Sequence, residues 1–144
     1  MSLEEQNKAL IREVTEKIWN QRRFELIPQF YSSDYVADTG PHAPLRKGPD
    51  GIKGMVERTY ATFPDYHEEI RQLIAEGDFV VVRLTNTGTQ QGQWGGIPPT
   101  GKRVEIDEIV ILQIHDGKIV GQKGIPDNLT ALRQLGVIPT PRQQ

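Results

Sequence analysis

The sequence predicts an α+β protein in which helices pack on one face of a strongly curved antiparallel sheet. Two observations carry this prediction: apolar residues recur at helical spacing in the N-terminal part, and alternate with polar residues from residue 66 onward. The 144 residues contain no internal repeat and no linker, so one core is expected. We therefore expect a single domain over residues 1–138, a frayed tail over residues 139–144, and a cone-shaped sheet that encloses a cavity.

Three helices are expected before the main strands. Residues 3–19 place their apolar side chains on one stripe, with charged residues opposite. Residues 24–31 repeat aromatic and aliphatic side chains at spacings of three and four, and Pro28 limits this segment to about two turns. The sequence Gly48-Pro49-Asp50-Gly51 opens a third helix, which ends before Phe63-Pro64.

The strands follow from alternation and turn residues. The expected strands are a short edge strand over 35–37, followed by 66–74, 79–84, 102–115 and 118–125. Asp116-Gly117 is a strong signal for a tight hairpin between the last two strands. Residues 92–101 form a glycine- and proline-rich connection, and Asp127 is placed to cap a final helix that ends at Gly136.

Charge and composition exclude several classes of partner. Seventeen Lys and Arg residues stand against nineteen Asp and Glu residues, a net charge of −2, so no basic footprint for nucleic acid is present. No apolar run approaches the roughly 18 residues of a membrane span. The chain has no cysteine, which excludes disulfides and thiolate chemistry and suits a reducing compartment. We expect a soluble, cytoplasmic protein that binds neither nucleic acid nor membrane.

Motifs for nucleotide, covalent-serine and zinc-protease chemistry are absent. The sequence has no G-x-S-x-G, P-loop, G-x-G-x-x-G or H-E-x-x-H segment. His42, His67 and His115 show no spacing typical of metal ligands. We expect neither a metal nor a cofactor.

Several segments nevertheless carry a family likeness over nearly the whole chain. They are Ile18-Trp19-Asn20-Gln21, Asp34-Tyr35-Val36, Gly48-Pro49-Asp50-Gly51, Phe63-Pro64-Asp65, residues 76–83, Gly88-Thr89, residues 96–101, residues 116–120 and residues 132–136. In this order they resemble the SnoaL-like polyketide cyclase or ester cyclase family, within the nuclear transport factor 2-like superfamily. The resemblance implies the α+β cone. It also implies ring closure by aldol condensation, with acid/base side chains in an apolar cavity and neither a metal nor a covalent intermediate.

The chain departs from the family pattern where this chemistry would lie. Gln90 follows Gly88-Thr89 where the family usually has a histidine, and Asp38 stands where a histidine is common. Gln122 and Gly124 replace a histidine and an aspartate of the last strand, and Val110 replaces an aspartate of the strand before it. The residues that usually transfer protons are largely missing.

Two carboxylates could compensate. Alternation places Glu108 on the same strand face as Val104 and Val110, so it is expected to point into the cone, where burial would raise its pKa into the range of a general base or acid. A bulge that turns Glu108 outward, or pairing with Lys102 or Arg103, is the alternative. Asp38 is the second catalytic candidate, and its alternative is a turn residue.

Other residues are candidates for the pocket wall. The aromatic candidates are Trp19, Tyr35, Tyr60, Phe63 and Trp94, which could instead be ordinary core residues. Arg83 could hold a polar group of the ligand or pair with a carboxylate across the sheet. Gln90 and Gln122 can orient a carbonyl group but cannot abstract a proton. Val110 and Gly124 complete the predicted lining.

These observations support three hypotheses. The first is a cyclase, isomerase or related lyase that acts on a small apolar carbonyl compound, with Glu108 or Asp38 as the acid/base group. The second is a non-catalytic protein that kept the pocket and binds a small apolar or aromatic ligand. The third is an interaction protein that works through the sheet face bearing Ile109 and Ile111. A homodimer or higher homo-oligomer is expected in each case.

Overall fold

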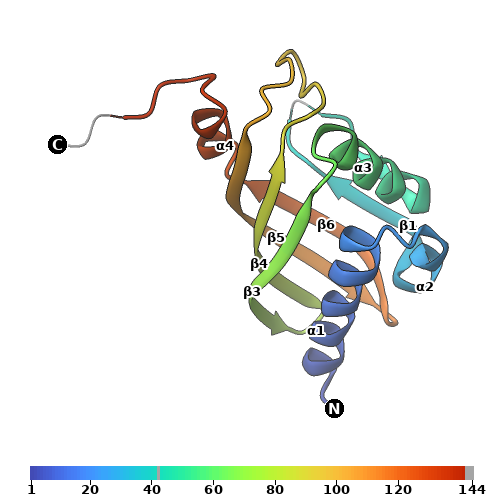
Figure 1. Ribbon diagram of the computed structural model, residues 1–144. Helices are drawn as coiled ribbons and strands as arrows, with labels where there is room; N and C mark the ends of the chain where they lie inside the picture. Colours follow the sequence, from blue (N-terminus) through green and yellow to red (C-terminus); the bar gives the residue numbers. More distant parts are fainter. Residues whose placement is uncertain (42, 142–144) are drawn as a thin grey trace.

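The computed structural model describes residues 1–41 and 43–141. His42 and the last three residues of the predicted tail lie outside the described residues. Figure 1 shows helices covering one face of a twisted sheet. No helix in the described ranges is long and apolar enough to cross a membrane.

The helices begin where capping residues allow. Helix α1 (Leu3–Val14) is capped by Ser2, whose hydroxyl accepts a hydrogen bond from the Glu5 backbone N–H at 3.1 Å. Helix α4 (Asn128–Gln134) is capped in the same way by Asp127. The remaining helical segments are a π-helix η1 (Thr15–Asn20), a 3₁₀ turn η2 (Phe24–Leu26), α2 (Ile27–Phe30) and α3 (Gly48–Thr62).

The strands form one sheet. They are β1 (Tyr31–Asp38), β2 (Arg46–Lys47), β3 (His67–Glu76), β4 (Phe79–Thr89), β5 (Arg103–His115) and β6 (Lys118–Pro126). Within the described residues their order is β2-β1-β6-β5-β4-β3. The α+β class is therefore as predicted, and the alternation of residues 104–114 places their even-numbered side chains inward.

The sheet is mixed, which corrects the expectation of a purely antiparallel sheet. Strand β1 pairs in parallel with β6 and antiparallel with β2, so it is an internal strand and not the predicted short edge strand. The physical reason is that β2, only two residues long, covers the far side of β1. Such a short partner gives no alternation that a sequence can reveal.

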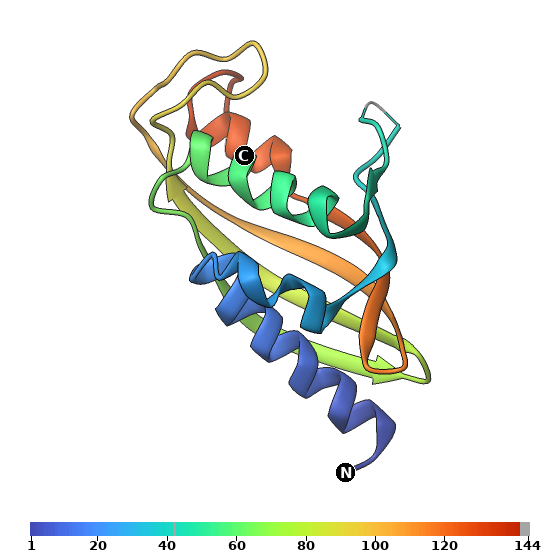
Figure 2. The ribbon, with the colours of Figure 1, turned by 90° about the vertical axis from the view of Figure 1, so that its right-hand side faces the viewer.

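The helices lie on the inner face of the sheet. Figure 2 shows α1 and α2 over one part of this face and α3 over the other. Ile11 and Ile18 from the first helical segments, Ile52 and Val56 from α3, and Val82 from β4 belong to one buried cluster. Burial of these side chains is the main source of stability.

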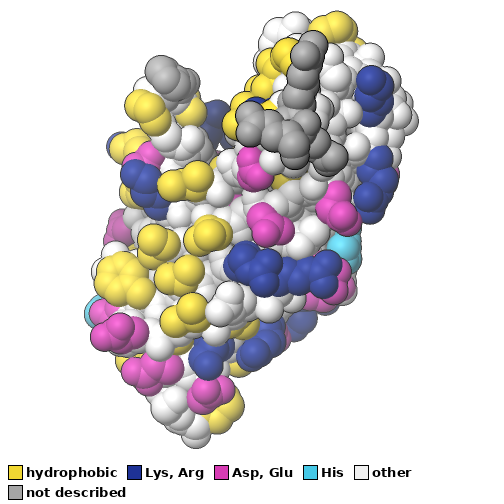
Figure 3. Space-filling model, turned by 90° about the vertical axis from the view of Figure 1, so that its left-hand side faces the viewer, with side chains coloured by type: hydrophobic (Ala, Val, Ile, Leu, Met, Phe, Trp, Pro, Cys, Tyr) yellow, Lys and Arg dark blue, Asp and Glu magenta, His cyan; other side chains and the backbone are white. Residues whose placement is uncertain are grey.

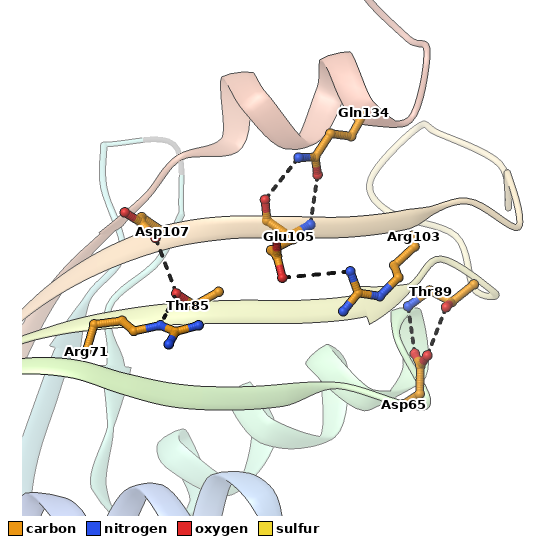
Figure 4. Close-up of polar contacts among 8 residues, drawn as sticks. All are labelled: Asp65, Arg71, Thr85, Thr89, Arg103, Glu105, Asp107 and Gln134. Atoms are coloured by element: carbon orange, nitrogen blue, oxygen red, sulfur yellow. Dashed lines mark hydrogen bonds and ion pairs between the residues drawn. The ribbon is translucent and has the colours of Figure 1, made fainter.

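Polar contacts fix the ends of β4 and β5 near α4 (Figure 4). The Gln134 amide donates to the Glu105 carbonyl at 3.0 Å and accepts from the Glu105 N–H at 2.8 Å, which attaches α4 to β5. The Asp65 carboxylate accepts hydrogen bonds from the Thr89 N–H and hydroxyl, which holds the end of β4. These contacts position the elements that surround the cavity described below.

Candidate active site

A cavity of about 550 Å³ lies on the inner face of the sheet, between β5, α3 and the connection that precedes β5. Its volume falls within the range of small-molecule pockets. The apolar part of its wall is formed by Trp19, Met55, Phe63, Trp94, Val104 and Ile106. The interior is therefore hollow, and it suits an apolar guest molecule.

Glu108 faces this cavity from β5. The Asn86 amide on β4 donates a hydrogen bond to Glu108 Oε1 at 2.8 Å. Burial raises the pKa of the Glu108 carboxyl above its usual value, and the hydrogen bond from Asn86 opposes this rise. No ion pair from Lys102 or Arg103 reaches Glu108 within the described part of the chain. The carboxyl is thus a titratable group held at the wall of a largely apolar cavity.

Gly124 provides the space that the Glu108 carboxyl occupies. A Cβ atom at position 124 would lie 2.9 Å from Glu108 Oε2 and 3.4 Å from Val110 Cγ2. A larger residue at 124 would require the carboxyl to move. Gly124 is therefore not part of the cavity wall. Because glycine has no side chain, the Glu108 carboxyl can occupy the space beside it.

A second cavity of about 60 Å³ lies behind Glu108. Glu108, Trp19 and Met55 line both cavities. Val110 and Gln122, two of the predicted pocket residues, line the small cavity and not the large one. The Gln122 amide oxygen accepts a hydrogen bond from the Tyr35 hydroxyl at 2.6 Å, so a buried core residue fixes the position of this amide.

A buried carboxyl that the sequence analysis did not single out, Glu68, also lines the small cavity. Only 5% of Glu68 is exposed, and its Oε1 accepts a hydrogen bond from the Tyr66 hydroxyl at 2.7 Å. Burial, and then the charge of Glu108, raise the pKa of Glu68 to about 8, while the Tyr66 hydrogen bond opposes the rise. Glu68 therefore holds a proton at neutral pH.

The π-helix positions the backbone of Glu68. The Asn20 side chain, at the end of η1, accepts from the Glu68 N–H at 2.8 Å and donates to the Glu68 carbonyl at 3.0 Å. The Tyr60 hydroxyl donates to the neighbouring Trp19 carbonyl at 2.6 Å. The predicted first helix thus ends in a wider turn that joins α1 to β3, and such turns are frequent at functional sites.

Two guanidinium groups complete the wall of the large cavity. Arg46 belongs to β2 and Arg58 to α3, and Arg58 is exposed to solvent. Although Arg58 is exposed as a whole, partial burial of its guanidinium group, and then the charge of Arg46, lower the pKa of Arg58. Neither arginine forms an ion pair with a described residue. This side of the cavity is therefore suited to a carbonyl, ester or carboxylate group of a ligand.

The predicted aromatic wall is only partly present. Trp19, Phe63 and Trp94 lie on the wall of the large cavity. Tyr35 and Tyr60 lie instead in the buried core, because the Tyr60 hydroxyl is taken up by backbone carbonyls and the Tyr35 ring packs edge-on against Tyr31.

Asp38, Arg83 and Gln90 lie outside both cavities, which corrects their expected place in the site. The Asp38 carboxylate accepts from the Gly40 N–H at 2.9 Å and lies 3.5 Å from Lys123 Nζ, and these two contacts lower its pKa. It is the half-buried last residue of β1, paired with a lysine outside the cavities, and is unsuited to act as a base in an apolar site.

Arg83 and Gln90 have structural partners. Arg83 lies on the outer face, 3.5 Å from the Asp107 carboxylate. Gln90 is fully buried, and its amide bonds the Ile97 and Pro98 carbonyls and the Thr100 hydroxyl. Gln90 therefore holds the connection between β4 and β5 and orients no ligand.

Glu68 and Asn86 were not among the predicted site residues, although the alternation of side chains could have indicated Glu68. Glu68 shares a predicted strand face with Tyr66 and Ile70, which is the pattern of a buried position. Asn86 lies beyond the predicted end of its strand, at residue 84, so no face was assigned to it. The pairing of Glu68 with Asn86 across β3 and β4 comes only from the register. The described residues contain no group of three or more acidic or histidine side chains that could hold a metal ion.

Fold and site together define a class of protein: an α+β cone with an apolar cavity and a carboxyl group at its inner wall. The sequence matches the SnoaL-like polyketide cyclase family over residues 9–135. The chain belongs to this family.

Relatives of known name support this assignment. The chain is 30% identical to the aklanonic acid methyl ester cyclase of Streptomyces peucetius, over 92% of each chain. It is 29% identical to the nogalonic acid methyl ester cyclase of Streptomyces nogalater, over 82% of this chain and 89% of that protein.

Solved structures share the fold. A protein from Jannaschia, described as SnoaL-like polyketide cyclase, superposes with a TM-score of 0.86 at 19% identity, over 96% of this chain and 97% of that one. A protein with a ketosteroid isomerase-like fold from Catenulispora acidiphila superposes with a TM-score of 0.75 at 17% identity, over 92% and 97%.

Proposed function

We propose that this protein is an enzyme that closes a ring in a polyketide-like carbonyl compound, with Glu108 as the general base. The observation that carries the proposal is a carboxyl group of raised pKa that faces a largely apolar cavity of about 550 Å³. Family membership supports it, and so do the names of the relatives, which are methyl ester cyclases.

The chemistry needs a base next to an acidic C–H bond. The ionised Glu108 carboxylate takes the proton from the carbon α to a carbonyl group and leaves an enolate. The enolate carbon attacks a ketone of the same molecule, so that one C–C bond forms and the ketone oxygen becomes an alkoxide. The alkoxide recovers a proton, with protonated Glu108 as the donor, and the product is an isomer of the substrate.

The wall of the cavity suits the parts of such a substrate. Trp19, Phe63 and Trp94 offer ring faces and edges to a flat aromatic system. Arg46 and Arg58 can bind the ester or carbonyl oxygens, where negative charge develops during the reaction. Asn86 holds the base in one orientation.

Product analysis tests this proposal. Aklanonic acid methyl ester and nogalonic acid methyl ester are incubated with the protein, and the product is separated by chromatography and weighed by mass spectrometry. We expect a product of unchanged mass, and a rate loss of about 10²–10⁴-fold in Glu108→Gln. Asp38→Asn serves as the matched control, since this carboxylate lies outside the cavities, and it should act as the unaltered protein does.

The competing function is binding without catalysis. If the probes bind, as shown by a raised melting temperature, but no isomer forms, the protein is a binding member of the family and the enzymatic proposal is wrong. If no compound of this class binds, both pocket functions are contradicted.

We further propose a homodimer that forms through the outer face of the sheet. Figure 3 shows apolar side chains gathered on this face beside rows of basic and acidic ones. The apolar members, here called the outer patch, are Ile74, Phe79, Ile109, Ile111 and Ile125, each 46–69% exposed. Arg83 and Asp107 border the outer patch with opposite charges. A second copy related by a twofold axis offers the same apolar area and the complementary charges.

A further inference from the structure

Glu68 has no part in the reaction proposed above, yet it is the most deeply buried carboxyl group among the described residues. It lies on β3 opposite Asn86 of β4, and Asn86 in turn donates a hydrogen bond to Glu108 of β5. The two carboxyl groups thus flank one amide on three neighbouring strands. A buried carboxyl is costly to stability unless something compensates it, so its presence calls for an explanation.

The small cavity joins these two groups. Its volume is about 60 Å³, and polar groups from five elements line it: Thr15 from η1, Tyr31 from β1, Glu68 from β3, Glu108 from β5 and Gln122 from β6. A water molecule takes up about 30 Å³ in the liquid and needs two to four polar partners. The space and the lining therefore suit one or two waters.

One buried hydroxyl in this cavity lacks a partner. The Tyr31 hydroxyl is buried. The Trp19 side chain acts on its pKa as a hydrogen-bonding neighbour, but no described residue forms a hydrogen bond of normal geometry with this hydroxyl. An unpaired buried hydroxyl costs about 1–3 kcal/mol, and a water in the small cavity would remove this penalty. Glu68 Oε1 is occupied by Tyr66, so the second carboxyl oxygen is the one available to the cavity.

We propose that ordered water in the small cavity links Glu68 to Glu108, and that Glu68 is a positioning residue that stores a proton and controls the ionisation of Glu108. The inference rests on the proposed role of Glu108 as the base. Protonated Glu68 donates a hydrogen bond through water toward the ionised Glu108. Because Glu68 stays protonated and neutral, Glu108 has no second buried negative charge beside it while it takes a proton from the substrate.

The surroundings of Glu68 favour this order of ionisation. The titratable groups that act on it are Glu108 and Tyr66, and Tyr31 and Tyr60 are in turn influenced by its charge. No lysine, arginine or histidine forms an ion pair with it within the described residues. Glu16 of η1 and Arg22 act on Tyr60 instead. Glu108, in contrast, has the Asn86 amide to stabilise its charge.

Nuclear magnetic resonance tests the link without a substrate. Protein labelled with ¹³C at the glutamate side-chain carboxyl carbons is titrated from pH 3 to pH 10. In the unaltered protein we expect Glu108 to ionise first, and its resonance to show a second inflection where Glu68 ionises, because groups that interact by more than about one pK unit titrate together.

Three variants complete the test. In Glu108→Gln the titration of Glu68 should move down by about one pH unit or more. In Glu68→Gln the second inflection of Glu108 should vanish. Tyr31→Phe, which removes only the hydroxyl that would hold the water, should weaken the second inflection of Glu108. Glu69→Gln is the matched control, since this carboxylate is exposed and pairs with Arg71 on the outer face.

Two results would overturn the inference. One is that each carboxyl titrates in a single step that is unmoved by the variant of the other. The other is a high-resolution crystal structure without water density between them. Should Glu68→Gln fail to fold, the unaltered protein, Glu108→Gln and Tyr31→Phe still decide the question. Because no substrate is involved, a coupled pair found in a protein that makes no product would sustain this inference while contradicting the proposed function.

Discussion

The Glu108 carboxyl of β5 lies in the space that a side chain at Gly124 of β6 would fill. The resemblance to the family places an aspartate at position 124, where this chain has glycine, and the carboxyl of Glu108 reaches to within 2.9 Å of the missing Cβ. Under the proposed function, the carboxyl group is supplied from β5 instead of β6. A longer side chain on the adjacent strand does this because Glu108 and Gly124 lie diagonally across one face of the sheet.

Replacement of Gly124 tests this relation. In Gly124→Ala the new methyl group should push the Glu108 carboxyl away from Asn86. Since the lost hydrogen bond had lowered the pKa of Glu108, that pKa should rise, and the protein should lose about 1 kcal/mol of stability. The ¹³C titration of Glu108 and urea unfolding measure the two effects.

Gly121→Ala is the matched control on the same strand. Its Cβ would meet only the Val36 carbonyl oxygen, at an ordinary 3.5 Å. An equal response of Glu108 to both substitutions would show that the glycine at 124 does not make room for the carboxyl.

The connection between β4 and β5 depends on one buried amide, that of Gln90. Gln90 accepts hydrogen bonds from the Thr100 N–H and hydroxyl and donates to the Ile97 and Pro98 carbonyls. Trp94, which lies within this connection, forms part of the cavity wall. The amide thus shapes the pocket from outside it.

We expect Gln90→Leu to destabilise the protein by about 3 kcal/mol, because several hydrogen bonds are lost and buried backbone groups remain unpaired. Urea unfolding measures this loss, and limited proteolysis should show cleavage within residues 91–101. Gln91→Leu, at an exposed neighbouring position, should change stability by less than about 0.5 kcal/mol. Equal stability of the two variants would contradict the role assigned to Gln90.

Local pattern was enough to predict most elements, but not the partners of β1. The period-two alternation of residues 104–114 predicted the inward face of β5 correctly, and with it the inward direction of Glu108. Strand β1 was predicted too short and at the edge. Its pairing with β6 is parallel and interrupted by an irregularity between Tyr31 and Val36, so exposed residues such as Ser33 and Asp34 mask the strand pattern.

Local sequence pattern also did not separate the residues of the cavity wall from those of the core. Trp19, Phe63 and Trp94 lie on the wall, while Tyr35 and Tyr60 have equally aromatic side chains and lie in the core. What separates them is the hydrogen bond that each tyrosine hydroxyl makes with a distant residue, Gln122 or Trp19. Glu68 and Asn86 are neighbours only through the register of β3 and β4, which no local pattern reveals.

For the whole molecule, the raised pKa values of Glu68 and Glu108 set how stability depends on pH. The folded state binds more protons than the unfolded state between the ordinary value of 4.5 and the raised value of about 8 for Glu68. Stability should therefore fall as the pH rises through this range, by at most about 1.4 kcal/mol per pH unit for each proton. The aspartates with lowered pKa values act below this range, with the opposite sign.

Urea unfolding at a series of pH values from 5 to 8 checks this dependence. Glu68→Gln should flatten the decline and should be more stable than the unaltered protein at pH 8. Glu69→Gln, whose carboxylate is exposed, should keep the decline. Stability that rises with pH over this range would contradict the assigned protonation of Glu68.

The proposed homodimer predicts a mass of twice the 16.3 kDa of one chain. Light scattering after size-exclusion chromatography measures it. Ile111→Lys, in the centre of the outer patch, should yield monomers because the interface would bury an unpaired charge. Leu45→Lys places the same charge at an exposed apolar residue just before β2, which is not part of the outer patch, and should remain dimeric. A monomeric unaltered protein would rule the dimer out.

The central claim is that Glu108 exchanges protons with a carbonyl compound held in the cavity. Deuterium uptake at the α-carbon of aklanonic acid methyl ester, followed in heavy water by mass spectrometry, tests it most directly, because it records the proton abstraction even where ring closure is slow. We predict uptake with the unaltered protein and a rate at least about 100-fold lower with Glu108→Gln. Equal uptake with both proteins, or none from a probe that binds, would contradict the claim.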